Sequence, residues 1–229
     1  MTETLQLVCP GCRVPLRREQ GSLSCPSCGL VAPIEDGVPV FVDSPEYWGE
    51  VGISRERAQE VNRRMATEDW RTVVGQHEAA DVRQYFRFVS NMDRIGWHTL
   101  LSLPRTSRVL DIGAGLGTMS YALSRCYDQV VAVERVRERV DFMRLRFRQD
   151  RAENITLIRT DMDTLPFAEG SFDLIVLNGV SDHSFAEALA NGHIVQAGAD
   201  VLVGDASGSI VTLANVSLSS LHASDFLFG

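Results

Sequence analysis

Four cysteines in the first 28 residues have the spacing of a metal site. Cys9 and Cys12 form one CxxC pair, Cys25 and Cys28 form a second, and twelve residues separate the two pairs. Two such turns on neighbouring hairpins present four thiolates at the corners of a tetrahedron, which suits Zn²⁺. A redox dithiol normally opens a helix after a strand, and neither pair has that context. We therefore expect a closed structural zinc site, because four cysteine ligands leave no position open for catalysis.

A second candidate site lies in the stretch RVLDIGAGLGTMSYAL, where Gly113, Gly115 and Gly117 fall within five residues. Glycine loses more conformational entropy on folding than any other residue, so three together indicate a close approach to the backbone. Asp111 ends the apolar run before the loop, and Glu134 ends the next run, 21 residues after Gly113. A carboxylate at that place can accept hydrogen bonds from two ribose hydroxyls. The pattern therefore indicates a nucleotide-like ligand.

The elements that must position these residues alternate along the chain. The runs RVLDIG, QVVAVE, ITLIRTD and FDLIVLNG read as strands, and the segments that follow the first two have the apolar stripes of amphipathic helices. Met119, Ala122 and Leu123 belong to the first stripe, and Val140 and Met143 to the second. This alternation predicts an α/β fold with a Rossmann-like, doubly wound and mainly parallel sheet.

We divide the chain into four segments by their composition and periodicity. The expected segments are a small zinc ribbon (1–43), a helical linker or cap (44–105), a core (106–182) and an atypical β-rich tail (183–229). In the linker, helices are expected near Ser54–Met65, His77–Ser90 and Met92–Ser102. The proposed ligand residues lie beyond Arg108, so we expect the core to keep its site folded when the ribbon is removed.

Charge and composition exclude several classes of protein. All 22 basic residues are arginines, so a lysine Schiff base and a P-loop lysine are excluded. The formal net charge is -8, and residues 160–229 hold nine acidic residues and no basic one. Such a segment is unsuited to following a phosphate backbone. The sequence shows neither a span of membrane length nor the pattern of a signal peptide, so we expect a cytoplasmic protein without a membrane partner.

The N-terminal segment resembles Trm112-like zinc ribbons. The two CxxC pairs and the closing strand IEDGVPVFV carry the resemblance over about residues 7–42. It implies a docking or activating module beside a methyltransferase, and therefore a protein partner bound through the ribbon.

Residues 106–180 resemble class I S-adenosylmethionine (SAM)-dependent methyltransferases. The stretches DIGAGLGT, RTDMDTLPF and SFDLIVLNGV, together with Glu134, carry this resemblance. It implies that the loop passes under the methionine and ribose of SAM, that Asp111 organises the loop and meets the methionine amino group, and that Glu134 holds the ribose. The remaining implied contacts are Asp161 and Met162 at the adenine, Arg135 along the adenosine, and Asn178 near the sulfonium. The implied cofactor set is thus Asp111, Gly113, Ala114, Gly115, Glu134, Arg135, Asp161, Met162 and Asn178.

The reaction beyond cofactor binding stays open at this level. No motif names a catalytic residue, and the family resemblance implies a small molecule, a glycan-linked group or RNA as the acceptor. A non-catalytic SAM-binding adaptor is one alternative, because the tail departs from the family. A nucleotide-dependent oxidoreductase is another, although a dinucleotide fold prefers glycine where Thr118 stands.

Other conspicuous residues have ordinary interpretations. The tail resembles the closing segment of repeats-in-toxin proteins but lacks their calcium-binding nonapeptide. We interpret Cys126 as a core thiol, His183 as a surface residue, and the arginines of residues 135–151 as a solvated helix face.

Overall fold

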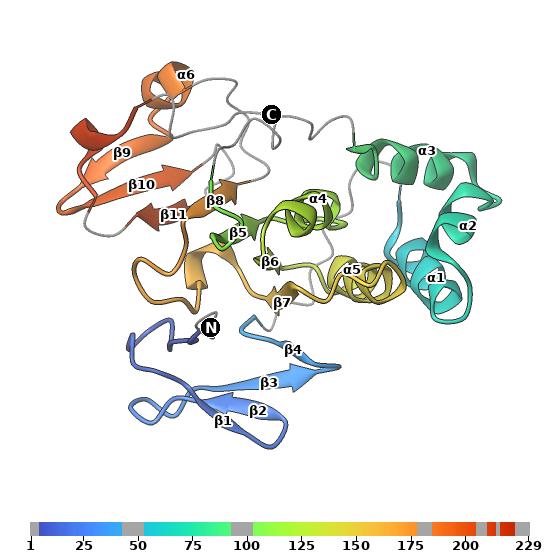
Figure 1. Cartoon of the computed structure of the whole chain (residues 1–229), viewed down its shortest axis with the longest axis horizontal. Coiled ribbons are helices and arrows are strands. Elements are labelled where there is room, and N and C mark those ends of the chain that lie inside the picture. Colours follow the sequence, from blue (N-terminus) through green and yellow to red (C-terminus); the bar gives the residue numbers. More distant parts are fainter. Residues whose placement is uncertain are drawn as a thin grey trace.

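Four parallel strands form the central sheet of the computed structural model, which describes residues 5–42, 53–92, 103–177, 185–204, 210–213 and 216–222. Their order across the sheet is β7-β6-β5-β8 (Figure 1). The strands are β5 (Arg108–Ile112), β6 (Gln129–Glu134), β7 (Ile155–Arg159) and β8 (Leu174–Leu177). All four were expected from their apolar runs, and the Rossmann-like α/β prediction is confirmed.

Two of the described helices cover one face of this sheet. They are α4 (Thr118–Cys126) and α5 (Arg137–Gln149). Leu123 of α4 packs on Val109 and Val130, and Met143 of α5 packs on Ala132. The alternate residues of the strands point to the other face, where Leu110 of β5 lies among ribbon and loop side chains. A strand buried on both faces reads as a continuous apolar run, which is why the sequence shows these strands so clearly.

Within residues 53–92, three further helices form a cap on the outer side of α5. The helical cap consists of α1 (Arg55–Met65), α2 (Trp70–Gly75) and α3 (Ala80–Val89). Ser54 begins α1, and its side chain accepts from the Arg57 amide at 3.4 Å. The short helix α2 was not anticipated; Asp69 caps it, and its Trp70 is buried. The helix expected over residues 92–102 lies almost entirely outside the described residues.

The zinc ribbon is an antiparallel sheet that packs against the core. Its strands are β1 (Arg17–Glu19), β2 (Ser22–Ser24), β3 (Val31–Glu35) and β4 (Val38–Pro39), in sequential order. Beyond β4 the chain runs beside the edge of β7: Val40 forms a parallel bridge with Arg159, and the Phe41 amide donates to the Arg159 carbonyl at 2.8 Å. Leu5, Leu7 and Phe41 pack on the second face of the central sheet.

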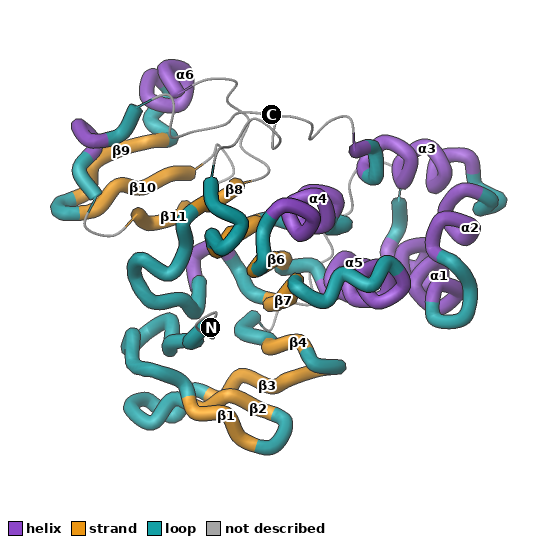
Figure 2. Tube along the Cα trace, viewed as in Figure 1, coloured by secondary structure: helices purple, strands orange, loops and turns teal. Residues whose placement is uncertain are grey.

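The described part of the tail forms a third sheet, which is antiparallel (Figure 2). After α6 (Phe185–Ala190) come β9 (Ile194–Ala197), β10 (Asp200–Gly204) and β11 (Ile210–Leu213), in the order β11-β10-β9. The expected change to antiparallel strands is therefore confirmed. Short 3-10 helices stand at Met162–Thr164 and Leu218–Ser220. No helix in the described part of the chain is long and apolar enough to cross a membrane.

Candidate functional site: a cysteine cluster and a glycine loop

The four ribbon cysteines converge on one point. Their sulfur atoms all lie within 4.8 Å of one another, and the Cys9 and Cys28 sulfurs are 3.7 Å apart. Four thiolates around Zn²⁺, with Zn–S bonds of about 2.3 Å, would stand about 3.8 Å apart. A disulfide would need about 2.05 Å, and all five cysteines are free. The cluster therefore fits Zn²⁺.

The backbone around the cysteines is arranged to hold thiolates. The Cys12 amide points at the Cys9 sulfur and the Ser27 amide at the Cys25 sulfur, each at 3.4 Å. The side-chain hydrogen bond with Cys28 raises the pKa of Cys12 to about 12, whereas a backbone hydrogen bond from Cys28 lowers that of Cys25 to about 7. Four thiols this close can all be deprotonated only when a bound cation neutralises the four thiolates.

Replacing Cys28 with serine should abolish the stoichiometric zinc content, about one ion per chain, because a closed site needs all four thiolates. Cys28 is the exposed member of the cluster, so its replacement removes a ligand without opening the core. Cys126 lies outside the cluster, partly buried against the cluster of Val109 and Leu123, and serves as the matched control. Elemental analysis of protein purified without chelator measures both variants. The assignment would be contradicted if the wild-type protein contained no zinc, or if Cys126→Ser lost its zinc.

The glycine loop follows β5 and owes its shape to its glycines. Gly113, Gly115 and Gly117 have φ angles of 69°, 59° and 74°, the left-handed region that favours glycine. At Gly117 a Cβ atom would also lie 2.4 Å from Cζ of Phe147. The third glycine therefore serves the packing of α5 on the loop, while the first two shape the strand-to-helix turn.

Glu134 turns back onto this loop instead of standing free in a cleft. Its Oε2 accepts from the Gly115 amide at 2.9 Å, and Oε1 accepts from the amides of Arg135 and Val136 at 2.8 Å each. Arg139 approaches Oε2 at 3.7 Å, and Glu134 is only 5% exposed. The carboxylate thus joins the glycine loop to the start of α5, at the carboxyl edge of the sheet where ligands bind in this architecture.

The next strand end supplies a charged pair. Arg135 Nη1 lies 2.9 Å from Asp161 Oδ2, and Asp161 Oδ1 accepts from the Met162 amide at 2.8 Å. The implied adenine residues are therefore next to Glu134 and partly exposed. Asp111 is fully buried and accepts from Ser120 Oγ, which ties β5 to α4. Asn178 lies outside the described residues.

One arginine of the supposedly solvated helix face is in fact buried. Arg146 is 2% exposed, and its Nη1 donates to the Leu116 carbonyl and to Thr118 Oγ1, both at 2.9 Å. Its guanidinium lies over the Trp70 ring of the cap, 4.7 Å from the centroid. Burial lowers the pKa of Arg146 to about 10. The second apolar stripe of α5, formed by Phe142 and Leu145, was the sequence signal that this helix is covered on two sides.

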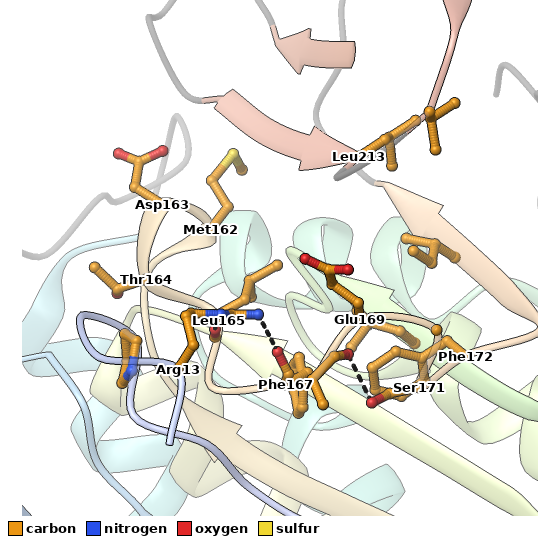
Figure 3. A pocket seen from close by; sticks show the side chains of 16 residues that line it. Arg13, Met162, Asp163, Thr164, Leu165, Phe167, Glu169, Ser171, Phe172 and Leu213 are labelled. Carbon is orange, nitrogen blue, oxygen red and sulfur yellow. Dashed lines mark hydrogen bonds between the residues drawn. The ribbon is translucent and has the colours of Figure 1, made fainter. Parts of the chain in front are cut away.

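A cavity of about 430 Å³ lies on the other face of the sheet, away from the glycine loop. Leu110, Phe172 and Leu213 line it, together with Arg13 of the ribbon and the loop of residues 162–171 (Figure 3). Asp111 and Glu134 do not line it, and of the implied cofactor residues that the structure describes it is lined by Met162 alone. We therefore assign the candidate ligand site to the loop edge and not to this cavity.

The fold and the loop define a Rossmann-like nucleotide-binding class, and comparison with known proteins is more specific. Residues 109–202 match the family model described as methyltransferase domain, and residues 6–37 match the Trm112p-like protein family. The first match runs beyond the predicted boundary at residue 182, through α6 and β9. The Rossmann-like central sheet is thus similar to SAM-dependent methyltransferase domains, and the ribbon is similar to Trm112p-like proteins.

Individual relatives match a shorter part of the chain. The chain is 34% identical over 82 residues to a protein-L-isoaspartate O-methyltransferase of Bradyrhizobium sp. (strain ORS 278), covering 36% of this chain and 38% of that protein. It is 32% identical over 76 residues to the uncharacterized methyltransferase YcgJ of Bacillus subtilis, covering 33% and 30%. A SAM-dependent methyltransferase structure from Aquifex aeolicus aligns with a TM-score of 0.35 and 19% identity, covering 40% of this chain and 50% of that one. The chain therefore spans less than two fifths of the length of the curated relatives it matches.

Proposed function

We propose that the protein binds SAM at the glycine loop and transfers its methyl group to an acceptor. The observation that carries the proposal is the Glu134 carboxylate, which lies against the Gly115 amide at the carboxyl edge of the sheet. The matches to methyltransferase domains and relatives support the choice of SAM over a dinucleotide.

The residues have distinct roles in this proposal. Gly113, Ala114 and Gly115 let the backbone approach the methionine and ribose portions of SAM. Three of about four acceptor positions of the Glu134 carboxylate already receive backbone amides, so the ribose hydroxyls would share or replace the Gly115 and Arg139 contacts. Asp161, Arg135 and Met162 would border the adenine, and Asn178 the reacting end.

Bound SAM would supply an electrophilic methyl group, and the protein would accelerate its transfer mainly by proximity and alignment. No described residue stands out as a catalytic base. The first relative matches over only 38% of its own length, so the isoaspartyl substrate in its name is only one acceptor to test, beside small molecules, glycan-linked groups and RNA. The acidic segment 160–229 weighs against RNA.

A thermal-shift comparison tests the ligand. SAM and S-adenosylhomocysteine should raise the unfolding temperature, because a ligand that binds only the folded state stabilises it by mass action. NAD and NADP should leave the unfolding temperature unchanged. Protection by NAD alone would favour the oxidoreductase alternative. Binding of SAM without turnover of any acceptor pool would favour the adaptor alternative, to which the ribbon's resemblance to docking modules lends support.

A further inference from the structure

The residue after each CxxC pair has the same unusual backbone conformation but a different side chain. Arg13 and Gly29 have φ angles of 59° and 75°, and their amides donate to the carbonyls of Cys9 and Cys25 at 2.8 and 3.1 Å. Glycine takes a left-handed conformation without steric cost, whereas a residue with a Cβ atom is strained there. The first turn therefore has a strained arginine at the position where the second turn has a glycine. The second turn shows that a glycine is enough to form the turn.

The side chain of Arg13 reaches the core domain. Its Nη1 donates to the Leu165 carbonyl at 3.2 Å, and its Nη2 donates to the Phe167 carbonyl (Figure 3). The Val8 amide donates to the Pro166 carbonyl between them at 2.9 Å. Three consecutive carbonyls of the core thus all accept from ribbon donors. A planar guanidinium with parallel N–H groups suits such a double contact better than a lysine ammonium.

The anchored segment continues directly from the candidate ligand site. Asp161 and Met162, the residues at the adenine side, begin the stretch that leads to Leu165, and Met162 opens its 3-10 helix. We propose that Arg13 is a positioning residue, which holds residues 161–167 in place from the zinc turn and so couples metal binding in the ribbon to cofactor binding in the core. The coupling to the cofactor rests on the proposed function.

The strained backbone makes Arg13→Gly a discriminating variant. It removes the guanidinium but also relieves the left-handed strain, so the zinc turn itself should be no less stable. Arg13→Lys retains the positive charge but lacks the two parallel N–H groups of the guanidinium. It should therefore restore only part of what Arg13→Gly loses. Arg17→Ala, at an exposed arginine of β1, is the matched control for loss of a positive charge from the ribbon.

The test uses the zinc-loaded, full-length protein. In Arg13→Gly, deuterium exchange of backbone amides in residues 162–172 should be about tenfold faster, and the affinity for S-adenosylhomocysteine about three- to tenfold lower, for the loss of two charged hydrogen bonds at a partly solvated site. The zinc content should equal that of the unchanged protein. Arg17→Ala should change none of these quantities.

Each outcome separates the two proposals. Unchanged exchange in Arg13→Gly with zinc retained overturns the inference, and so does faster exchange with unchanged affinity, since Arg13 would then only join two segments. If the wild-type protein does not bind S-adenosylhomocysteine, the proposed function is overturned instead. This measurement needs no variant.

Discussion

Glu134→Ala is expected to weaken the binding of S-adenosylhomocysteine by about 30- to 1,000-fold. Two charge-assisted hydrogen bonds to the ribose are worth about 1.5–3 kcal/mol each, and because they are not additive a net loss of roughly 2–4 kcal/mol follows. Titration calorimetry on the folded variant measures the change directly. An unchanged dissociation constant would mean that Glu134 serves the fold alone, and the proposed site would be withdrawn.

The same substitution should also destabilise the protein. A carboxylate facing an open cleft would contribute little to folding, as the sequence suggested, but Glu134 is buried and accepts from three backbone amides. Leaving these donors without an acceptor costs about 1–3 kcal/mol in the free energy of unfolding, measurable by urea denaturation.

Two further variants separate ligand binding from stability. Glu134→Gln keeps one acceptor oxygen for the Arg135 and Val136 amides but loses the charge, so it should retain more stability than affinity. Asn154→Ala removes two hydrogen bonds, to the carbonyls of Ser124 and Tyr127, at the opposite end of β7. It should lower stability without changing the affinity. An equal loss of affinity in Asn154→Ala would show that the Glu134 effect merely reports partial unfolding.

The central sheet could be predicted because its signals are local. The central strands β5 and β6 are almost fully buried and read as apolar runs. Each CxxC pair spans four residues, and the three glycines fall within five residues. Glu134 could be placed at a strand end for the same reason. Its burial could not, because the Gly115 amide that it meets lies 19 residues away and is brought there by the loop.

The features that sequence reasoning missed depend on distant partners. Arg146 looks solvated until the cap places Trp70 over it, and Trp70 is 76 residues earlier in the chain. Arg13 carries no ligand motif, and its partners in the core lie more than 150 residues away. Charge and periodicity in the sequence predict the surroundings of a residue only within its own helix or turn. The surroundings of Arg13 and Arg146 depend on the packing of one segment on another.

Removal of residues 1–43 is expected to abolish cooperative folding of the core. The sequence suggested an independent ribbon, because every proposed SAM ligand lies beyond Arg108. In the structure, however, Leu5, Leu7 and Phe41 belong to the same apolar cluster as Leu110 and Ile158 of the central sheet. Burial of an apolar side chain stabilises by about 1.5–3 kcal/mol, so three partly buried ones account for about 3–6 kcal/mol. A whole domain has only about 5–15 kcal/mol of stability to lose.

Point variants keep this prediction informative if the shortened protein is insoluble. Phe41→Ala should lower the free energy of unfolding of the full chain by about 2–3 kcal/mol, since it deletes a partly buried aromatic ring. Glu35→Gln breaks the exposed contact with Arg137, 3.4 Å away, and should cost less than about 1 kcal/mol. If the shortened protein instead unfolds cooperatively at the urea midpoint of the full chain, the ribbon is an independent module after all. Loss of stability in both the shortened protein and Phe41→Ala, with Glu35→Gln unaffected, would show that apolar contacts and not surface charges make the ribbon part of the core.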